Sequence, residues 1–170
     1  TSIVKMLESE NGFSKIADEI LTDVCNYLKI SNAALIRINR DGETADMISE
    51  CCLEEEDALI AKCQGISTSE FPFTNGKPYM ISADSILPPA FAQFFEKWNI
   101  QAAISLPVEI NGEAAMYLCF FELRKRRIWD VSDIKFLNEV KQIVQSILIK
   151  RITKNSLASS YASLEAILEN

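Results

Sequence analysis

Histidine is missing from this chain of 170 residues, and its absence excludes several kinds of chemistry. No Ser-His or Cys-His nucleophile pair can form, and no histidine can ligate zinc or haem iron. Glycine is scarce, with 5 residues, and neither the G-x-x-x-x-G-K-[ST] loop nor the G-x-G-x-x-G turn occurs. We therefore expect no catalytic residues, no metal and no cofactor.

Positive charge and long apolar runs are also limited. Lys and Arg number 17 against 24 Asp and Glu, and the net charge of -7 repels nucleic acid and anionic lipid. No apolar run approaches the roughly 20 residues of a membrane span, and the N-terminus lacks the basic-then-apolar order of a signal peptide. The 5 cysteines show no C-x-x-C spacing, which indicates reduced thiols. The sequence predicts a cytoplasmic protein with no nucleic-acid partner and no membrane span.

Apolar periodicity marks the first half of the chain. Residues 13–28 repeat apolar side chains at three- and four-residue intervals, which predicts an amphipathic helix, and residues 1–12 continue a similar stripe as a short helix or linker. Two apolar runs at residues 33–38 and 45–53 flank Asp41-Gly42, a pattern typical of a β-hairpin. The first of these runs is apolar on both faces and is expected to be a central strand.

The middle of the chain is less regular. Residues 54–63 predict a short helix, residues 65–78 a long loop and residues 79–82 a short edge strand. Pro88 and Pro89 then suit the first turn of an aromatic helix, because proline is favoured there.

A second hairpin and a long helix complete the chain. Residues 102–110 and 114–123 flank Asn111-Gly112, which suits a type I′ turn. Asp130 or Ser132 can cap a helix that runs past residue 154. This order predicts an α+β fold, with helices layered on an antiparallel sheet.

Five segments in this order are similar to those of the GAF family of small-molecule-sensing domains. They are the entry helix, the first hairpin, residues 76–84 (GKPYMISAD), residues 104–112 (ISLPVEING) and residues 127–137 (RIWDVSDIKFL). The resemblance implies a GAF/PAS-like sheet of about six antiparallel strands, helices on one face and a long C-terminal helix. It also implies a ligand pocket on the other face, roofed by the irregular middle segment. The divisions expected are a helix or linker at residues 1–12, a sensory domain at 13–152 and a signalling helix at 153–170.

Departures from the family's known ligand patterns reduce the number of ligands and activities that we expect for this chain. The Asn-Lys-Phe-Asp-Glu pattern of cyclic-nucleotide-binding relatives is absent, and bilin- and haem-binding relatives use a histidine, which this chain lacks. Relatives that reduce free methionine sulfoxide place cysteines in the middle loop and a late strand. Here Cys63 precedes that loop and Cys119 lies in an apolar strand, so we expect no such enzyme but keep it as an alternative.

Eight residues are candidates for the ligand pocket. Arg37 interrupts an apolar strand, where it clamps a ligand carboxylate, pairs with Glu50 or Asp46, or extends to water at the sheet edge. Asp84 either accepts hydrogen bonds from a ligand or closes a turn, and the aromatic residues either wall a ligand or pack as plain core. The full set is Arg37, Phe71, Phe73, Tyr79, Asp84, Phe91, Phe94 and Ser105.

The end of the last helix carries a different apolar pattern. Leu157, Tyr161, Leu164 and Leu168 are spaced by four, three and four residues, as in the seam of a parallel coiled coil. The apolar residues before Ile152 follow another phase, so a register slip is expected between Ile152 and Leu157. Residues 163–170 (SLEAILEN) also resemble the lead-in helix of a PAS domain.

These features predict a non-catalytic sensory domain that binds an unknown small molecule and forms a homodimer. Its C-terminal helix is expected to pass the signal to a downstream output domain in the same chain, namely a PAS domain, a histidine kinase or a diguanylate cyclase. The alternative is a dimerisation scaffold without a ligand.

Overall fold

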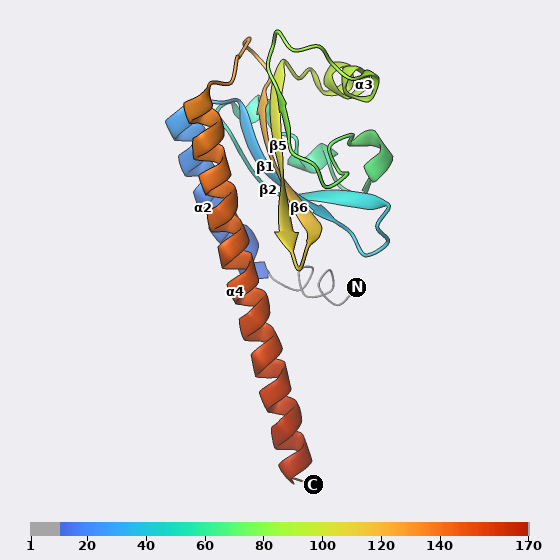
Figure 1. The fold of residues 1–170 in the computed structure, drawn as a ribbon, viewed down its shortest axis with the longest axis vertical. Helices are drawn as coiled ribbons and strands as arrows, with labels where there is room; N and C mark the ends of the chain where they lie inside the picture. Colours follow the sequence, from blue (N-terminus) through green and yellow to red (C-terminus); the bar gives the residue numbers. More distant parts are fainter. Residues whose placement is uncertain (1–10, 170) are drawn as a thin grey trace.

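The computed structural model describes residues 11–169 and contains one six-stranded sheet with helices on both faces. The helices are α2 (Asn11–Leu28), α3 (Pro89–Trp98) and α4 (Val131–Glu169). The strands are β1 (Asn32–Ile38), β2 (Thr44–Cys52), β3 (Ile66–Ser67), β4 (Tyr79–Ile81), β5 (Ala102–Ile110) and β6 (Glu113–Glu122). Their order across the sheet is β3-β2-β1-β6-β5-β4 and every pairing is antiparallel (Figure 1). The predicted α+β fold is confirmed. The helix or linker predicted at residues 1–12 lies mostly outside the described residues.

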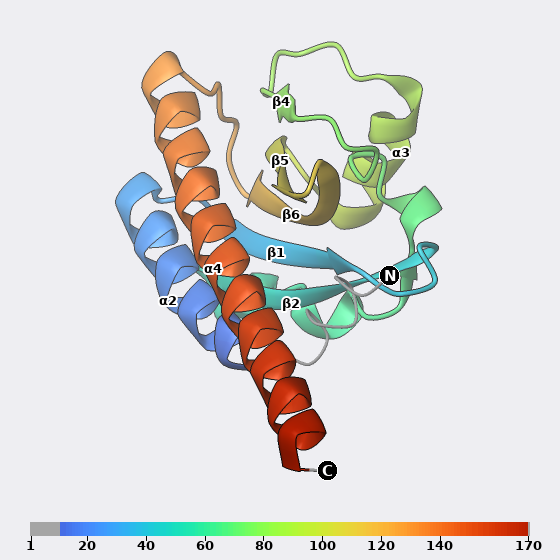
Figure 2. The same cartoon turned by 60° about the horizontal axis from the view of Figure 1, so that its bottom comes forward.

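The two faces of the sheet build separate hydrophobic cores. Because side chains alternate along a strand, Leu35 and Leu118 face α2 and α4, whereas Ile36 and Tyr117 face α3. Figures 1 and 2 show α2 and α4 side by side on one face, where the Tyr27 and Phe136 rings lie 4.8 Å apart between centroids. The β1 strand has β2 and β6 as neighbours, which confirms its predicted central position.

The long helix α4 starts at a well-formed cap. Asp130 Oδ1 accepts hydrogen bonds from the Asp133 backbone N–H, at 2.7 Å, and from the Ser132 hydroxyl, at 2.8 Å. This arrangement satisfies backbone donors that a helix leaves unpaired at its N-terminus. No helix within residues 11–169 combines the length and apolar character needed to cross a membrane.

The predicted helix at residues 54–63 is wrong. The segment forms two single turns of 3-10 helix, η1 (Glu55–Asp57) and η2 (Ile60–Lys62), separated by Ala58 in an extended conformation. The Glu50 carboxylate accepts hydrogen bonds from the backbone N–H groups of Leu59 and Ile60, so these donors are engaged by the sheet and not by a helix. The predicted loop at residues 65–78 also contains a two-residue strand, β3, and a third turn, η3 (Thr68–Glu70).

Candidate functional site

The face of the sheet covered by α3, where a ligand pocket was expected, is filled by aromatic side chains. Phe71 stacks on Phe73 with ring centroids 5.4 Å apart, and Phe94 meets both at 5.9 and 5.5 Å. Phe91 adds an edge contact to Phe94 at 6.5 Å. All four side chains are buried.

A void of about 10 Å³ remains beside this aromatic core, lined in part by Phe71 and Phe94. That volume is at the lower limit for one water molecule, since a cavity needs roughly 10–15 Å³ to hold one. A ligand can enter this face only if core side chains move. A ligand-binding role for the aromatic residues stays a prediction.

Two polar pocket candidates lie at the edge of the aromatic core. Tyr79 is half-buried on β4, with its ring 4.7 Å from that of Phe91 between centroids. Ser105 is buried on β5 and accepts a weak hydrogen bond from the Cys119 thiol at 3.8 Å. The structure therefore brings these two residues together with the predicted aromatic set.

Arg37 and Asp84 are placed differently. Arg37 forms an ion pair with Asp46 at 3.0 Å, one of the arrangements that the sequence allows. Because Ile36 faces α3, its neighbour Arg37 lies on the opposite face of the sheet, away from the aromatic core. Asp84 lies in the turn after β4. Neither position supports contact with a ligand held under α3.

The two cysteines relevant to the reductase alternative are buried. Burial raises the pKa of the Cys63 thiol to about 11, and burial also places the pKa of Cys119 far above its ordinary value. Both thiols are therefore protonated near neutral pH, and a protonated thiol is a poor nucleophile.

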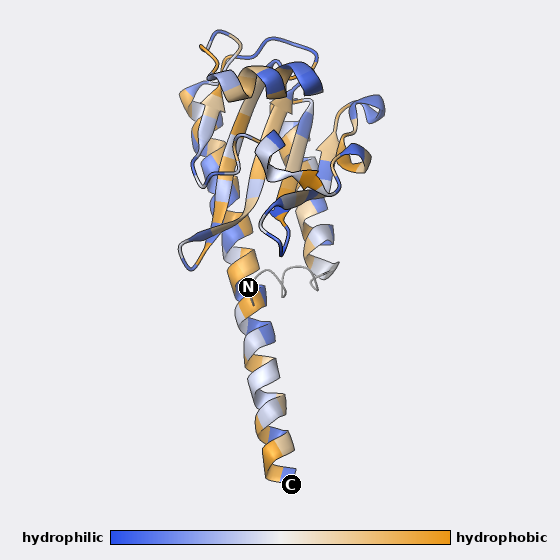
Figure 3. Ribbon diagram, turned by 90° about the vertical axis from the view of Figure 1, so that its right-hand side faces the viewer, coloured by the Kyte–Doolittle hydropathy of each residue, from blue (hydrophilic) through white to orange (hydrophobic). Residues whose placement is uncertain are grey.

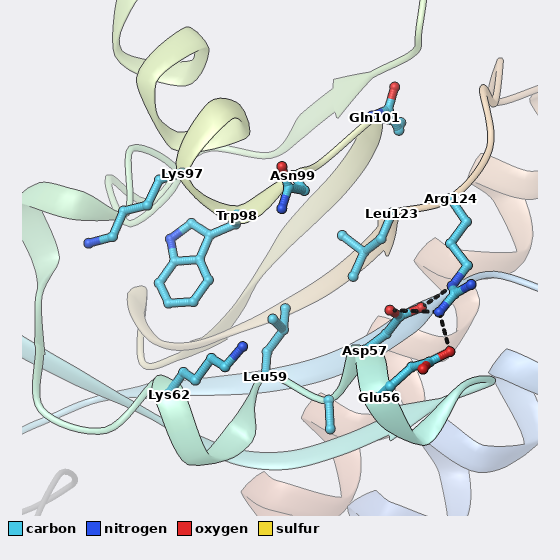
Figure 4. A pocket seen from close by; sticks show the side chains of 11 residues that line it. Glu56, Asp57, Leu59, Lys62, Lys97, Trp98, Asn99, Gln101, Leu123 and Arg124 are labelled. Atoms are coloured by element: carbon cyan, nitrogen blue, oxygen red, sulfur yellow. Dashed lines mark hydrogen bonds and ion pairs between the residues drawn. The ribbon is translucent and has the colours of Figure 1, made fainter.

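An open cleft, which sequence reasoning missed, lies at the end of the sheet where β6 stops and β5 begins. Its volume is about 600 Å³, within the range of roughly 300–1,000 Å³ that is usual for small-molecule sites. Figure 4 shows the lining side chains, which come from η1, η2, the C-terminal end of α3 and the residues that flank β5 and β6. They are Glu56, Asp57, Ala58, Leu59, Lys62, Lys97, Trp98, Asn99, Gln101, Leu123 and Arg124.

Polar side chains of the two neighbouring strands β1 and β2 hold one wall of this cleft in place. The Glu50 carboxylate on β2 accepts from the Leu59 N–H at 2.8 Å and from the side-chain amide of Asn32 at 2.9 Å. The same amide nitrogen of Asn32 donates to the carbonyl of Asp57 at 3.0 Å. These bonds fix the irregular segment that carries η1 and η2 to the central strands, so the wall is preorganised.

Ion pairs define the charge of the cleft. Arg124 pairs with Asp57 and with Glu56, each at 2.6 Å, as the dashed lines in Figure 4 show. Lys97 pairs with Glu70 at 2.6 Å, and its Nζ lies 5.5 Å from the centroid of the Trp98 ring.

The second half of α4 forms a separate exposed feature. Leu137, Val140, Val144 and Leu148 are buried against the sheet and α2, and burial decreases to an intermediate level at Ile152. Residues 153–169 are exposed, and this half of the helix projects away from the body of the fold (Figure 1). The predicted seam residues there, Leu157, Tyr161, Leu164 and Leu168, are between 51% and 75% exposed.

Comparisons with known proteins agree with this architecture. The family model described as GAF domain matches residues 13–146, so the chain belongs to the GAF family. No curated protein matches the chain.

Several solved structures share the fold. The blue-light absorbing form of the Thermosynechococcus elongatus PixJ GAF-domain is 13% identical, with a TM-score of 0.70 over 91% of this chain and 94% of that one. A phycocyanobilin-bound GAF domain from a cyanobacterial phytochrome is 9% identical, with a TM-score of 0.70 over 90% and 95%. A domain of a putative two-component sensor histidine kinase from Sinorhizobium meliloti 1021 is 13% identical, with a TM-score of 0.63 over 85% and 95%. At these identities the likeness shows the fold alone.

Proposed function

We propose that this chain is a non-catalytic regulatory GAF domain of a cytoplasmic sensor protein, which pairs with a second copy of itself through the free half of α4. The observation that carries the proposal is the change in environment along this single helix. Its first half belongs to the domain core, whereas its second half presents apolar side chains that are largely exposed in the described part of the chain.

The spacing of the exposed side chains supports pairing with a second helix. Residues at four-, three- and four-residue intervals lie along one narrow stripe of a helix, which is the arrangement of a coiled-coil seam. In Figure 3 apolar segments recur along this half of α4 among polar ones. A second copy of the same helix would cover the stripe and remove it from water.

The continuous helix also supports signal transfer. No break interrupts α4 between Val131 and Glu169, so a shift of its core-packed half moves the free half as well. The register slip predicted between Ile152 and Leu157 falls where burial ends. We propose that this is the joint at which the paired helices rotate or splay.

The output that we propose is a further domain in the same chain. The PAS-like pattern at residues 163–170 supports a PAS domain next in order, ahead of a histidine kinase or diguanylate cyclase. The neighbour from a two-component sensor histidine kinase protein fits the same kind of assembly.

Two observations bear on the alternatives. The closed aromatic core favours a scaffold without a ligand under α3, whereas the open, preorganised cleft favours sensing at another place. The raised pKa values of Cys63 and Cys119 disfavour methionine sulfoxide reduction, because that chemistry requires a nucleophilic thiolate. We therefore propose a sensor without catalysis.

Replacement of Leu164 by Glu tests the pairing. A leucine side chain contributes about 2 kcal/mol when it is buried, and the loss occurs in both copies, so the dissociation constant of the dimer should rise roughly a hundredfold or more. Sedimentation equilibrium across a concentration series measures this constant. A wild-type chain that is monomeric at all concentrations would contradict the proposal.

The matched control is Ser159→Glu. Ser159 lies on the same exposed half of α4 but opposite the seam, so the same new charge should leave the dimer intact. Equal weakening by both substitutions would show a general charge effect and not a seam at Leu164.

A further inference from the structure

The cleft between η1, η2 and the end of α3 combines an apolar floor with a polar rim. Leu59, Trp98 and Leu123 contribute apolar surface, and Asn99 and Gln101 contribute exposed amides at the edge. Leu59 and Trp98 also line the small void of the aromatic core, so the floor of the cleft adjoins that core. A ligand that combines a flat apolar body with a polar group fits this mixed lining.

Among the described residues, one cation that lines the cleft has no ion pair. The guanidinium of Arg124 is neutralised by Glu56 and Asp57, and the ammonium of Lys97 by Glu70. Among residues 11–169, Lys62 has no acidic partner within ion-pair distance, and its side chain extends toward Trp98 and Leu59 (Figure 4). Arg124 faces two carboxylates and Lys97 faces one, so Lys62 is the cation among the described lining residues that is left for an anionic ligand, and it lies beside the Trp98 ring.

Trp98 itself has an unused hydrogen-bond donor. Its indole Nε1 is buried and has no hydrogen-bond partner within the described residues. This nitrogen is closed to solvent, so a ligand in the open cleft contacts the exposed part of the Trp98 ring, and only a rearrangement of Trp98 would bring an acceptor to Nε1.

The remaining charges limit the ligand to a single negative charge. The cleft receives the C-terminal end of α3, where Asn99 is the cap residue, and this end of a helix carries a partial negative charge. Glu56 and Asp57 add two carboxylates on the other wall. A dianionic phosphate is disfavoured in this setting, whereas one carboxylate matches one ammonium.

We propose that this cleft binds a small aromatic monocarboxylate, with its carboxylate on Lys62 and its ring against Trp98 and Leu59. Binding there stands independently of helix pairing, since the cleft lies at the end of the sheet and the seam lies on the free half of α4. Occupancy of the cleft and the oligomeric state are therefore separate readouts, and either proposal can fail alone.

Chemical-shift titration of the ¹⁵N-labelled chain tests the site. The probes are benzoate and indole-3-carboxylate, compared with their neutral amides, benzamide and indole-3-carboxamide. We expect saturable shifts in the Trp98 indole N–H and in the backbone signals of Lys62, Asn99 and Gln101 for the acids. The amides should bind at least tenfold more weakly, because they lack the charge that Lys62 recognises.

Lys62→Gln should weaken binding of both acids at least tenfold, and Lys77→Gln should leave it unchanged. Both lysines are exposed, so neither substitution disturbs the core, and Lys77 lies outside the lining of the cleft. Absence of shifts at low-millimolar acid, or equal binding by the Lys62→Gln variant, would overturn the site. Tighter binding of phenyl phosphate than of benzoate would overturn the assignment to carboxylates.

Discussion

Three of the five cysteines, Cys25, Cys63 and Cys119, are buried, and burial is the main cause that raises the pKa of each thiol. The unfolded chain releases these protons near the ordinary thiol pKa, whereas the folded chain retains them to higher pH. The unfolded state therefore binds fewer protons than the folded state in alkaline solution, and stability falls as the pH rises. Below the ordinary thiol pKa the effect vanishes.

Because the pKa of Cys63 rises from 9.0 to about 11 on folding, this thiol makes the free energy of unfolding depend measurably on pH. Replacement by Ala should reduce the loss of unfolding free energy between about pH 8 and about pH 10.5 by roughly 2 kcal/mol, because the titrating thiol is gone. Urea denaturation under reducing conditions, at both pH values, measures the difference. An identical pH dependence in the wild type and the variant would show that this thiol titrates alike in both states.

Arg37 and Glu50 differ in how well their contacts could be predicted from the sequence. The Arg37–Asp46 pair was one of the arrangements open to Arg37, since an arginine in an apolar strand needs an anion or water and Asp46 lies on the neighbouring strand. Glu50 was not identified as the anchor of the cleft wall. Its backbone partners at residues 59 and 60 belong to a segment whose conformation depends on the same hydrogen bonds.

The second hairpin is the element for which the local sequence is most decisive. Asn111 and Gly112 have positive φ angles of 55° and 78°, as a type I′ turn requires, so the predicted turn is confirmed. A Cβ at position 112 would meet no atom within 4 Å, so backbone strain is the only cost of a side chain there.

Gly112→Ala should therefore lower the unfolding free energy by roughly 1–2 kcal/mol, the cost of a left-handed conformation for an L-residue. Asn111→Gly is the control, because glycine adopts positive φ readily, and its effect should stay within about 0.5 kcal/mol. Thermal or urea unfolding of the two variants provides the comparison. A loss as large in Asn111→Gly as in Gly112→Ala would point to the asparagine side chain as the source of stability.

In the middle segment, unlike in the second hairpin, the local sequence does not decide the conformation. Residues 54–63 carry a pattern compatible with a helix, yet the structure has two separate turns, because the sheet supplies hydrogen-bond partners that a helix would otherwise provide. Tertiary contacts override local propensity where a short segment lies against buried polar groups. The cleft wall belongs to this part of the chain, so its shape was not predictable from periodicity.

At the scale of the whole molecule, α4 links a packed domain to an exposed stripe. Beyond Ile152 every described residue of the helix is exposed, so the free half contributes little to the stability of the domain. A chain that ends at Ile152 should fold, with an unfolding midpoint within a few degrees of the intact chain, and it should be monomeric. Differential scanning calorimetry and light scattering on the two chains provide the measurement.

The opposite result would be informative about the interface. A shortened chain that still forms a dimer would place the contact on α2 and the core-packed half of α4, where Tyr27 and Ile143 are exposed. A shortened chain that fails to fold would show that pairing contributes to the stability of the domain itself.

The sequence by itself determined the elements outside the middle segment, and their order. Alternation, helical periodicity, the Asn-Gly turn and the Asp130 cap are local signals, and each depends on residues within a few positions of one another. Only the tertiary structure decided whether a face of the sheet carries a packed core or a cavity. The aromatic residues under α3 could line a cavity or fill it. Which of the two occurs depends on how side chains from distant segments pack, and composition does not specify packing. The residues concerned are Phe71, Phe73, Phe91 and Phe94. The cleft likewise joins residues 56–62, 97–101 and 123–124, which become neighbours only once the sheet has brought its strand ends together.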